Sequence, residues 1–129
     1  MEYIFEKDLK DEKILGLCSN IFFYDKPERV KSNEYIRWFI LDEQERAFAG
    51  GESLYTEFDI QVDIYTESSY RYLAKIIIDI LREKKYNLIG NSNSVVKKGD
   101  MKIYNKTLRF RFNKYNVKEG NNKWEQVQV

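Results

Sequence analysis

Three polar side chains, Asp59, Gln61 and Asp63, alternate along one segment of the chain. Because side chains two residues apart point to the same face of a strand, these three groups project together. Carboxylates grouped in this way could bind a hard cation such as Mg²⁺ or Ca²⁺. They could also act as a general acid and base pair.

Arginines alternate in the same manner on another segment, at Arg109 and Arg111, and Arg37 lies on a third. Guanidinium groups pair well with carboxylates across a sheet or between subunits. Three interpretations therefore remain open for the acidic and basic faces. We favour solvated faces or pairing within the fold, place a subunit interface second, and place a metal or catalytic site last, because no motif accompanies the carboxylates.

The other residue types offer little for catalysis. The chain has no histidine, which removes the commonest general base and metal ligand. Its one cysteine, Cys18, stands among apolar residues and is expected to be a small buried side chain. Gly50 and Gly51 lie outside any phosphate-binding pattern and are expected to form a hairpin turn, with partner docking as the functional alternative. We predict no catalytic residue, cofactor or bound metal, and hence no enzyme.

Basic and aromatic residues interleave between positions 106 and 115, a composition that can hold single-stranded nucleic acid. The arginines and phenylalanines are expected on opposite faces, and the formal net charge is only +1. Sequence-specific nucleic-acid binding is therefore not expected. Trp124 stands alone in a polar stretch, where a tryptophan favours docking to a partner.

The periodicity of apolar residues predicts the elements that position these groups. Alternation with a period of two predicts a clear strand over 55–65, and apolar residues three and four apart predict a helix over about 69–85. Two polar regions, 42–53 and 90–100, are expected to be connections. The remaining predictions are a helix over 7–17 and strands over 21–24, 34–41, 86–89, 101–104 and 107–112.

These elements predict one α+β domain over residues 1–113, followed by a polar tail over 114–129. The expected architecture is a mainly antiparallel sheet of about four or five strands, with a long amphipathic helix and a short N-terminal helix packed on one face. The N-terminus lacks the apolar core of a signal peptide, and no stretch is long enough to span a membrane. We therefore expect a cytoplasmic protein without a membrane partner.

The order of elements resembles the tail-completion, or tail-terminator, proteins of long-tailed bacteriophages. The resemblance covers roughly residues 5–113 and is carried by four segments. The most recognisable is the QVDIYT stretch at 61–66 that precedes the helix at 69–85. Besides this stretch and the helix, the two remaining segments are YIRW at 35–38 and KTLRF at 106–110. The family has no catalytic motif.

The resemblance implies a structural protein of the virion or of a phage-tail-like particle. Such proteins close the end of the tail tube, usually as a ring of six, and present a surface to the head-side connector or collar. The expected partners are copies of the chain, the tube protein and the sheath, and the expected location is the host bacterial cytoplasm and then the particle. The alternative is a small regulatory protein-binding module, acting as a monomer or dimer. A metal-dependent hydrolase using Asp59 and Asp63 is the second rival.

Overall fold

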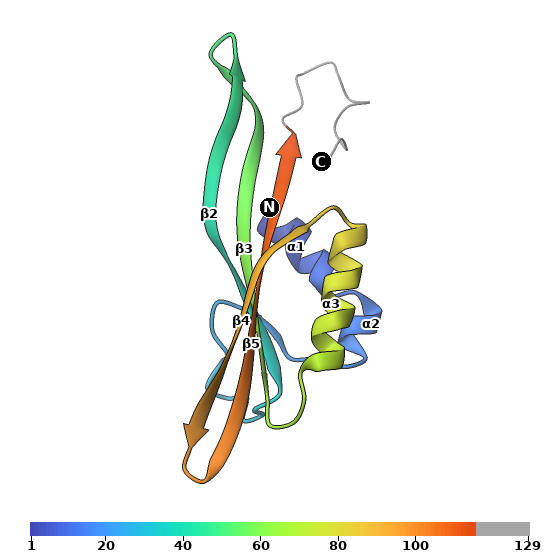
Figure 1. Ribbon diagram of the computed structural model, residues 1–129, viewed down its shortest axis with the longest axis vertical. Coiled ribbons are helices and arrows are strands. Elements are labelled where there is room, and N and C mark those ends of the chain that lie inside the picture. Colours follow the sequence, from blue (N-terminus) through green and yellow to red (C-terminus); the bar gives the residue numbers. More distant parts are fainter. Residues whose placement is uncertain (116–129) are drawn as a thin grey trace.

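A single five-stranded sheet runs the length of the molecule, and three helices cover one of its faces (Figure 1). The computed structural model describes residues 1–115. The strand order is β1-β2-β3-β5-β4. The elements are α1 (Glu2–Leu9), α2 (Glu12–Leu15), β1 (Ile21–Phe23), β2 (Tyr35–Ala49), β3 (Glu52–Thr66), α3 (Arg71–Glu83), β4 (Asn87–Lys98) and β5 (Met101–Tyr115). The predicted α+β class is confirmed.

The central strand, β3, shows why the sheet has one dry face. Its apolar residues at alternate positions, from Phe58 to Ile64, are buried, and the residues between them face away from the helices. On β5, Leu108 and Phe110 lie directly opposite Val62 and Ile60, so their side chains join the same apolar layer. The strand predicted over 55–65 and its apolar face are therefore confirmed.

Helix α3 packs its apolar stripe on this layer. Ile77, Ile80 and Leu81 are buried, as their spacing of three and four residues predicts. The helix has 13 residues, so the long helix that we expected is wrong. Its first turn begins at Arg71 because residues 67–70 form a turn in which the Thr66 hydroxyl accepts a hydrogen bond from the Ser68 backbone N–H (3.1 Å).

The N-terminal segment forms two helices in place of the single helix predicted over 7–17. Asp11 accounts for the break, because its carboxylate accepts a hydrogen bond from the Lys13 backbone N–H (2.9 Å) and so caps a new helix. Phe5 and Leu9, four residues apart, bury one face of α1, and Ile14 anchors α2. The prediction missed Phe5, which is fully buried against the rings of Trp38 and Tyr86.

We expected a mainly antiparallel sheet, and strand β1 makes the sheet mixed. Ile21 pairs with Ile36 in the parallel direction, and the other three strand pairs are antiparallel. The connection over 24–34 turns the chain back before β2 starts, and Tyr24 (φ 67°) begins that turn. Parallel neighbours need such a crossover, and nothing in the residue types of 21–24 reveals the pairing direction.

Two long hairpins replace the polar connections predicted over 42–53 and 90–100 (Figure 1). Strands β2 and β3 continue as a paired hairpin to its tip at Gly50 and Gly51, which both have positive φ (60° and 82°). The predicted glycine turn is therefore confirmed, but the flanking connection is wrong. Strands β4 and β5 likewise pair up to a turn at Gly99 (φ 64°). Both outer segments lack apolar alternation because neither of their faces reaches the core.

Candidate assembly interface

The face of the sheet opposite the helices carries the predicted charged residues. The register places Arg37 of β2 opposite Asp63 of β3, and Asp59 of β3 opposite Arg111 of β5. Gln61 and Arg109 are also direct partners across β3 and β5. The structure thus brings all six predicted residues onto one face, where opposite charges meet within the same chain.

Asp63 is the best-satisfied of these groups and only 1% exposed. Its carboxylate accepts hydrogen bonds from Arg37 Nε (2.9 Å), Thr107 Oγ1 (2.7 Å) and Gln61 Nε2 (3.0 Å). Burial is the largest single effect and lowers the pKa of the Arg37 guanidinium, but the hydrogen bond to Asp63 and the electrostatic effects of Tyr65, Asp63 and Tyr35 together leave that pKa raised. A buried carboxylate that accepts hydrogen bonds from three donors has a structural role, because it links neighbouring strands of the sheet.

Asp59 forms a second ion pair nearer the solvent. Arg111 donates to both of its oxygens, with Nε to Oδ1 at 2.8 Å and Nη2 to Oδ2 at 3.0 Å. Arg111 Nε also lies 3.5 Å from a carboxylate oxygen of Glu57. The hydrogen bond to Asp59 raises the pKa of Arg111. Two-pronged pairing of this kind fixes the register of β3 and β5.

Arg109 differs from the other five residues. Its side chain is exposed, and among residues 1–115 it forms no hydrogen bond or ion pair. Its neighbour Gln61 turns toward Asp63 instead. Within the described residues, no group of three or more histidine, cysteine, aspartate or glutamate side chains could hold a metal ion. Asp59 and Asp63 are each paired with an arginine.

An aromatic cluster, which the sequence did not indicate, surrounds Arg37 on the same face. Tyr35 stacks on Tyr65 at 4.6 Å between ring centroids, and Tyr24 stacks on Phe39 at 5.9 Å. The guanidinium carbon of Arg37 lies 5.5 Å from the Tyr65 ring centroid. Burial raises the pKa of Tyr35 and of Tyr65. Half-exposed tyrosine, phenylalanine and arginine are the residue types that protein interfaces favour.

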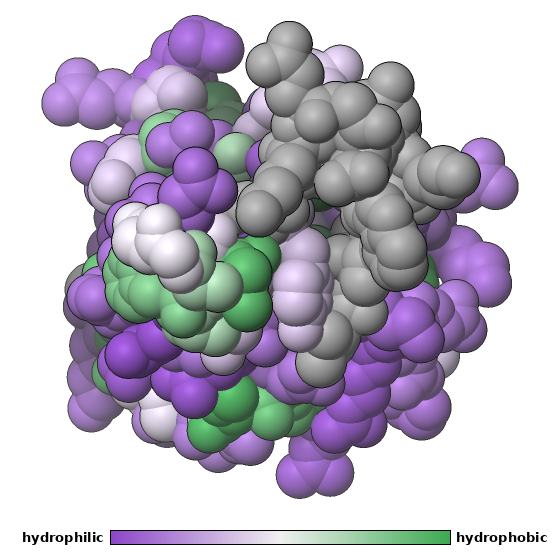
Figure 2. All heavy atoms as spheres, turned by 90° about the horizontal axis from the view of Figure 1, so that it is seen from above, coloured by the Kyte–Doolittle hydropathy of each residue, from purple (hydrophilic) through white to green (hydrophobic). Residues whose placement is uncertain are grey.

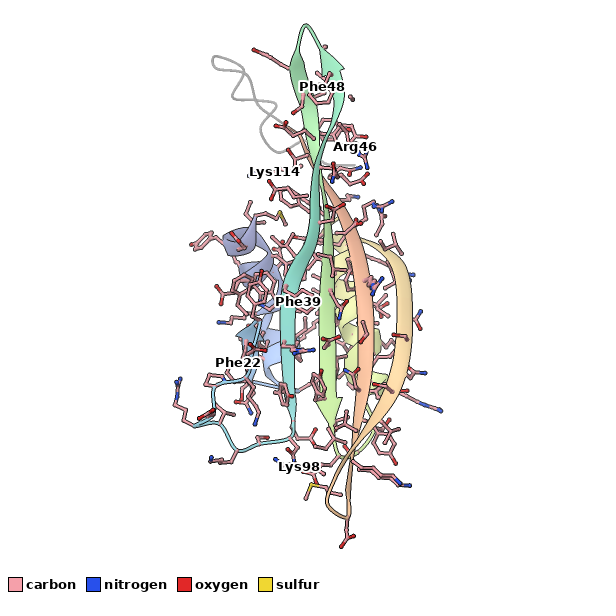
Figure 3. The ribbon with its side chains drawn as sticks, turned by 90° about the vertical axis from the view of Figure 1, so that its left-hand side faces the viewer. Phe22, Phe39, Arg46, Phe48, Lys98 and Lys114 are labelled. Atoms are coloured by element: carbon pink, nitrogen blue, oxygen red, sulfur yellow. The ribbon has the colours of Figure 1, made fainter. Side chains whose placement is uncertain are left out.

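The cluster was missed because it depends on the parallel pairing of β1. That pairing places Phe22 opposite Arg37 on the open face, and its ring contacts Tyr35 at 6.4 Å. Figure 3 shows Phe22 and Phe39 on neighbouring strands of this face. The alternation of Tyr35, Arg37 and Phe39 was visible in the sequence, but the neighbour supplied by β1 was not.

The tip of the β2–β3 hairpin projects beyond the core and carries exposed apolar side chains. Phe48 is 63% exposed, and Leu54 is also exposed. Figure 2 looks onto this end of the molecule and shows apolar surface set among hydrophilic residues. The opposite hairpin exposes Val95, Val96 and Met101. Both ends of the sheet therefore present apolar groups that the chain itself does not cover within residues 1–115.

An open cleft of about 580 Å³ lies between α3 and the β4–β5 hairpin. The charged residues of its lining are mostly basic: Arg71, Lys75, Arg82 and Lys106 stand against one acidic residue, Asp79. Lys75 pairs with Asp79 (2.8 Å), and Lys106 donates to the side-chain oxygens of two asparagines of β4. The cleft thus carries an excess of positive charge beside an edge strand.

The other described residues that the sequence singled out lie outside this charged face. Cys18 is half-buried, and burial raises the pKa of its thiol, which keeps it protonated. Phe110 and Phe112 are buried under the helices, on the face opposite Arg109 and Arg111, and are unavailable for stacking on bases. Trp124 and the tail from residue 116 lie outside the described residues. No helix within residues 1–115 is long and apolar enough to cross a membrane.

No protein-family model matches the chain, and a comparison with curated protein sequences found no match.

Proposed function

We propose that this chain is a structural assembly protein that closes the end of a phage or phage-tail-like tail tube. It acts as a ring of its own copies, a hexamer in the family it resembles, and joins the tube to the head-side connector or collar. The protein is made in the host bacterial cytoplasm and ends in the particle. The observation that carries this proposal is the pair of hairpins that project from opposite ends of one small core (Figure 1).

Projecting hairpins suit contacts between different surfaces of neighbouring copies. A hairpin that leaves the core cannot bury its apolar side chains in its own subunit, and here both projecting ends expose them. When such an end meets a different surface of the next copy, the contact is heterologous and is repeated by every copy. A ring forms when the rotation between copies closes.

The open face divides into residues that hold the subunit and residues free for a partner. Asp59, Gln61 and Asp63 are engaged within the sheet, as are Arg37 and Arg111. We assign these five residues to positioning the interface and Arg109 to direct contact with a neighbour or the tube.

Reversal of the charge at Arg109 tests this division. The Arg109→Glu variant should lower ring formation and leave the thermal midpoint of the monomer unchanged, because its guanidinium has no partner within residues 1–115. The equivalent change at exposed Lys7 on α1 is the control. Equal assembly of the two variants would remove Arg109 from the interface.

The tip of the β2–β3 hairpin, with Gly50 and Gly51, is assigned to docking on the tube or on the connector. Its exposed Phe48 supplies the anchor (Figure 3). Trp124 in the tail is proposed as a second docking residue.

The direct experiment mixes purified protein with tail tubes of the particle encoded in the same gene cluster. Electron microscopy with labelled protein should find it at one end of each tube, and tube growth should stop there. The Phe48→Ser variant should lose end binding, whereas Tyr72→Ser should not. Tyr72 is a matched control, because its exposure of 64% is close to the 63% of Phe48 but it lies on α3. Binding along the tube walls, or no binding, would overturn the proposal.

The alternative function is a small regulatory module that binds a protein as a monomer or dimer. The basic cleft beside α3 favours it, because a concave site on a monomer is what a regulator needs. A chain that remains monomeric or dimeric at all concentrations, ignores tubes and binds acidic peptides in the cleft would establish this alternative.

A further inference from the structure

Strand β4 is an outer strand of the sheet, and no strand among residues 1–115 pairs with its free edge. The ten residues from Asn87 to Val96 carry no charge. Soluble proteins normally protect an exposed edge with charged side chains, proline or an early end to the strand. The bulge between Leu88 and Gly90 can hinder pairing only along the first part of this edge. The rest, with Val95 (52% exposed), is open to pairing with another strand.

The opposite edge of the sheet is also free, but it is acidic. Strand β1 covers β2 only from Ile36 to Trp38, so the edge from residue 39 to 49 has no neighbour among residues 1–115. This segment contains Asp42, Glu43 and Glu45 against one arginine. Glu43 lies opposite Phe58, which points to the helix side of the sheet, so Glu43 and Glu45 project to that side.

Resting on the proposed function, we propose that the occupant of the β4 edge is β2 of a second copy. Its free segment adds to β4 as a further antiparallel strand, and Glu43 and Glu45 enter the basic cleft beside α3. Main-chain hydrogen bonds supply the pairing, and the cleft supplies the choice of partner. The contact joins two different edges, so each copy in a ring gives one edge and receives the other.

The directions and faces of the strands agree with this contact. Within the sheet, β4 runs opposite to β2, because three antiparallel pairings separate them. A neighbour that keeps its helices on the same side therefore presents β2 antiparallel to β4. The register that sets Glu43 opposite Asn93 and Glu45 opposite Asn91 points both carboxylates toward Lys106, which those two asparagines contact.

This register also permits closure of a ring. It displaces the neighbour by about six residues along the strands, or roughly 20 Å, while the four strands from β2 to β4 are about 19 Å wide, because β1 does not lie between the two paired edges. The strands then incline by about 46° to the ring axis, at the upper end of the tilt of about 35–45° in closed barrels. Acidic charges on β2 disfavour pairing between the β2 edges of two copies. The free edge of β4 carries no charge from Asn87 to Val96 that would repel a β2 strand.

The first test reverses charges on the two sides of the contact in the full chain. Glu43→Lys with Glu45→Lys changes the strand, and Arg71→Glu with Arg82→Glu changes the cleft. These four side chains form no ion pair within residues 1–115, so their reversal should leave the thermal midpoint of the monomer unchanged. Each double variant should raise the dissociation constant of the assembly at least about tenfold, and the quadruple variant should restore it to within about threefold.

A control double variant, Glu2→Lys with Glu28→Lys, makes the same change in net charge as the strand variant, on exposed residues outside the two segments that pair. It should assemble like the unchanged chain. The readout is sedimentation velocity over a range of concentrations. If the quadruple variant, with charges reversed on both the strand and the cleft, assembles no better than the two double variants, the proposal is wrong.

The second test acts on the backbone of β4. Consecutive residues of a strand point their N–H groups to opposite edges, so proline at one of Val95 and Val96 removes an N–H that faces the neighbour. The variant that removes the N–H facing the neighbouring copy should keep its thermal midpoint and lose assembly. The other variant removes an N–H that pairs with β5, so it should lose stability as well. Rings that survive in both variants would overturn the edge contact but leave the ring function intact. A third outcome is a dimer that dissociates in the proline variants but is unaffected by charge reversal at Glu43 and Glu45. That result would mean that the β4 edges of two copies pair with each other, and it would overturn the proposed contact.

A chain that forms no ring with or without tubes overturns both the proposed function and this contact.

Discussion

Replacement of Asp63 by asparagine should destabilise the fold far more than the same replacement at Asp59. Asp63 is 1% exposed, and its two oxygens accept hydrogen bonds from Arg37, Gln61 and Thr107. Asparagine keeps one acceptor oxygen, removes the charge and places an amide beside the donors. Breaking a fully buried ion pair costs about 3–5 kcal/mol. Because the Arg37 side chain remains 33% exposed, we expect about 2–4 kcal/mol here.

Asp59→Asn is the matched control. Asp59 makes its ion pair with Arg111, whose side chain is 41% exposed, so water can replace the lost contact. Exposed pairs contribute about 0–1 kcal/mol, and we expect a loss in that range. The assay is urea unfolding followed by far-ultraviolet circular dichroism, with the free energy of unfolding compared at equal slope. Equal losses below about 1 kcal/mol at both positions would refute the structural role of Asp63.

Three further predictions concern other parts of the fold. Burial and a hydrogen bond to a carboxylate raise the pKa of Tyr86 far above its ordinary value of 10.0, so stability should be complete below pH 10 and fall as the pH rises above it. Tyr86→Phe should lose about 1 kcal/mol at pH 7 and show a shallower alkaline decline, measured by urea unfolding at several pH values. Phe5→Ala should cost about 3–5 kcal/mol in the same assay, whereas Tyr3→Ala, 81% exposed, should be near neutral. Gly51→Val forces a branched side chain to a φ of 82° and should speed amide hydrogen exchange in the β2–β3 hairpin, whereas Gly90→Ala should not.

The core of the fold was accessible from the sequence, because burial leaves a periodic record. The alternation from Phe58 to Ile64 and the stripe through Ile77 and Leu81 each report one dry face. The turn at the hairpin tip could also be predicted from its two glycines, because its backbone needs positive φ and glycine adopts it readily.

The outer halves of both hairpins left no such record. Residues 42–49 and 90–98 have two wet faces, so their strand structure depends on backbone pairing with a partner strand and not on apolar alternation. The direction of β1 was hidden for a similar reason, because parallel pairing depends on the path of the connection at 24–34.

The candidate site was predicted as a set of residues but not as an arrangement. The face-sharing of Asp59, Gln61 and Asp63 follows from their spacing, and their arginine partners were anticipated. The strand register decides that these pairs form within one chain, and alternation alone cannot fix the register. One consequence is that Asp63 cannot serve in a charge-reversal test of ring formation, because reversal there would destabilise the subunit itself.

Native mass spectrometry of the purified full chain, over a range of concentrations and with tail tubes added, tests directly whether the protein forms a ring. A closed ring gives one species of defined size, about six copies, that persists on dilution. Monomers or dimers at every concentration, or open polymers that lengthen with concentration, would contradict it.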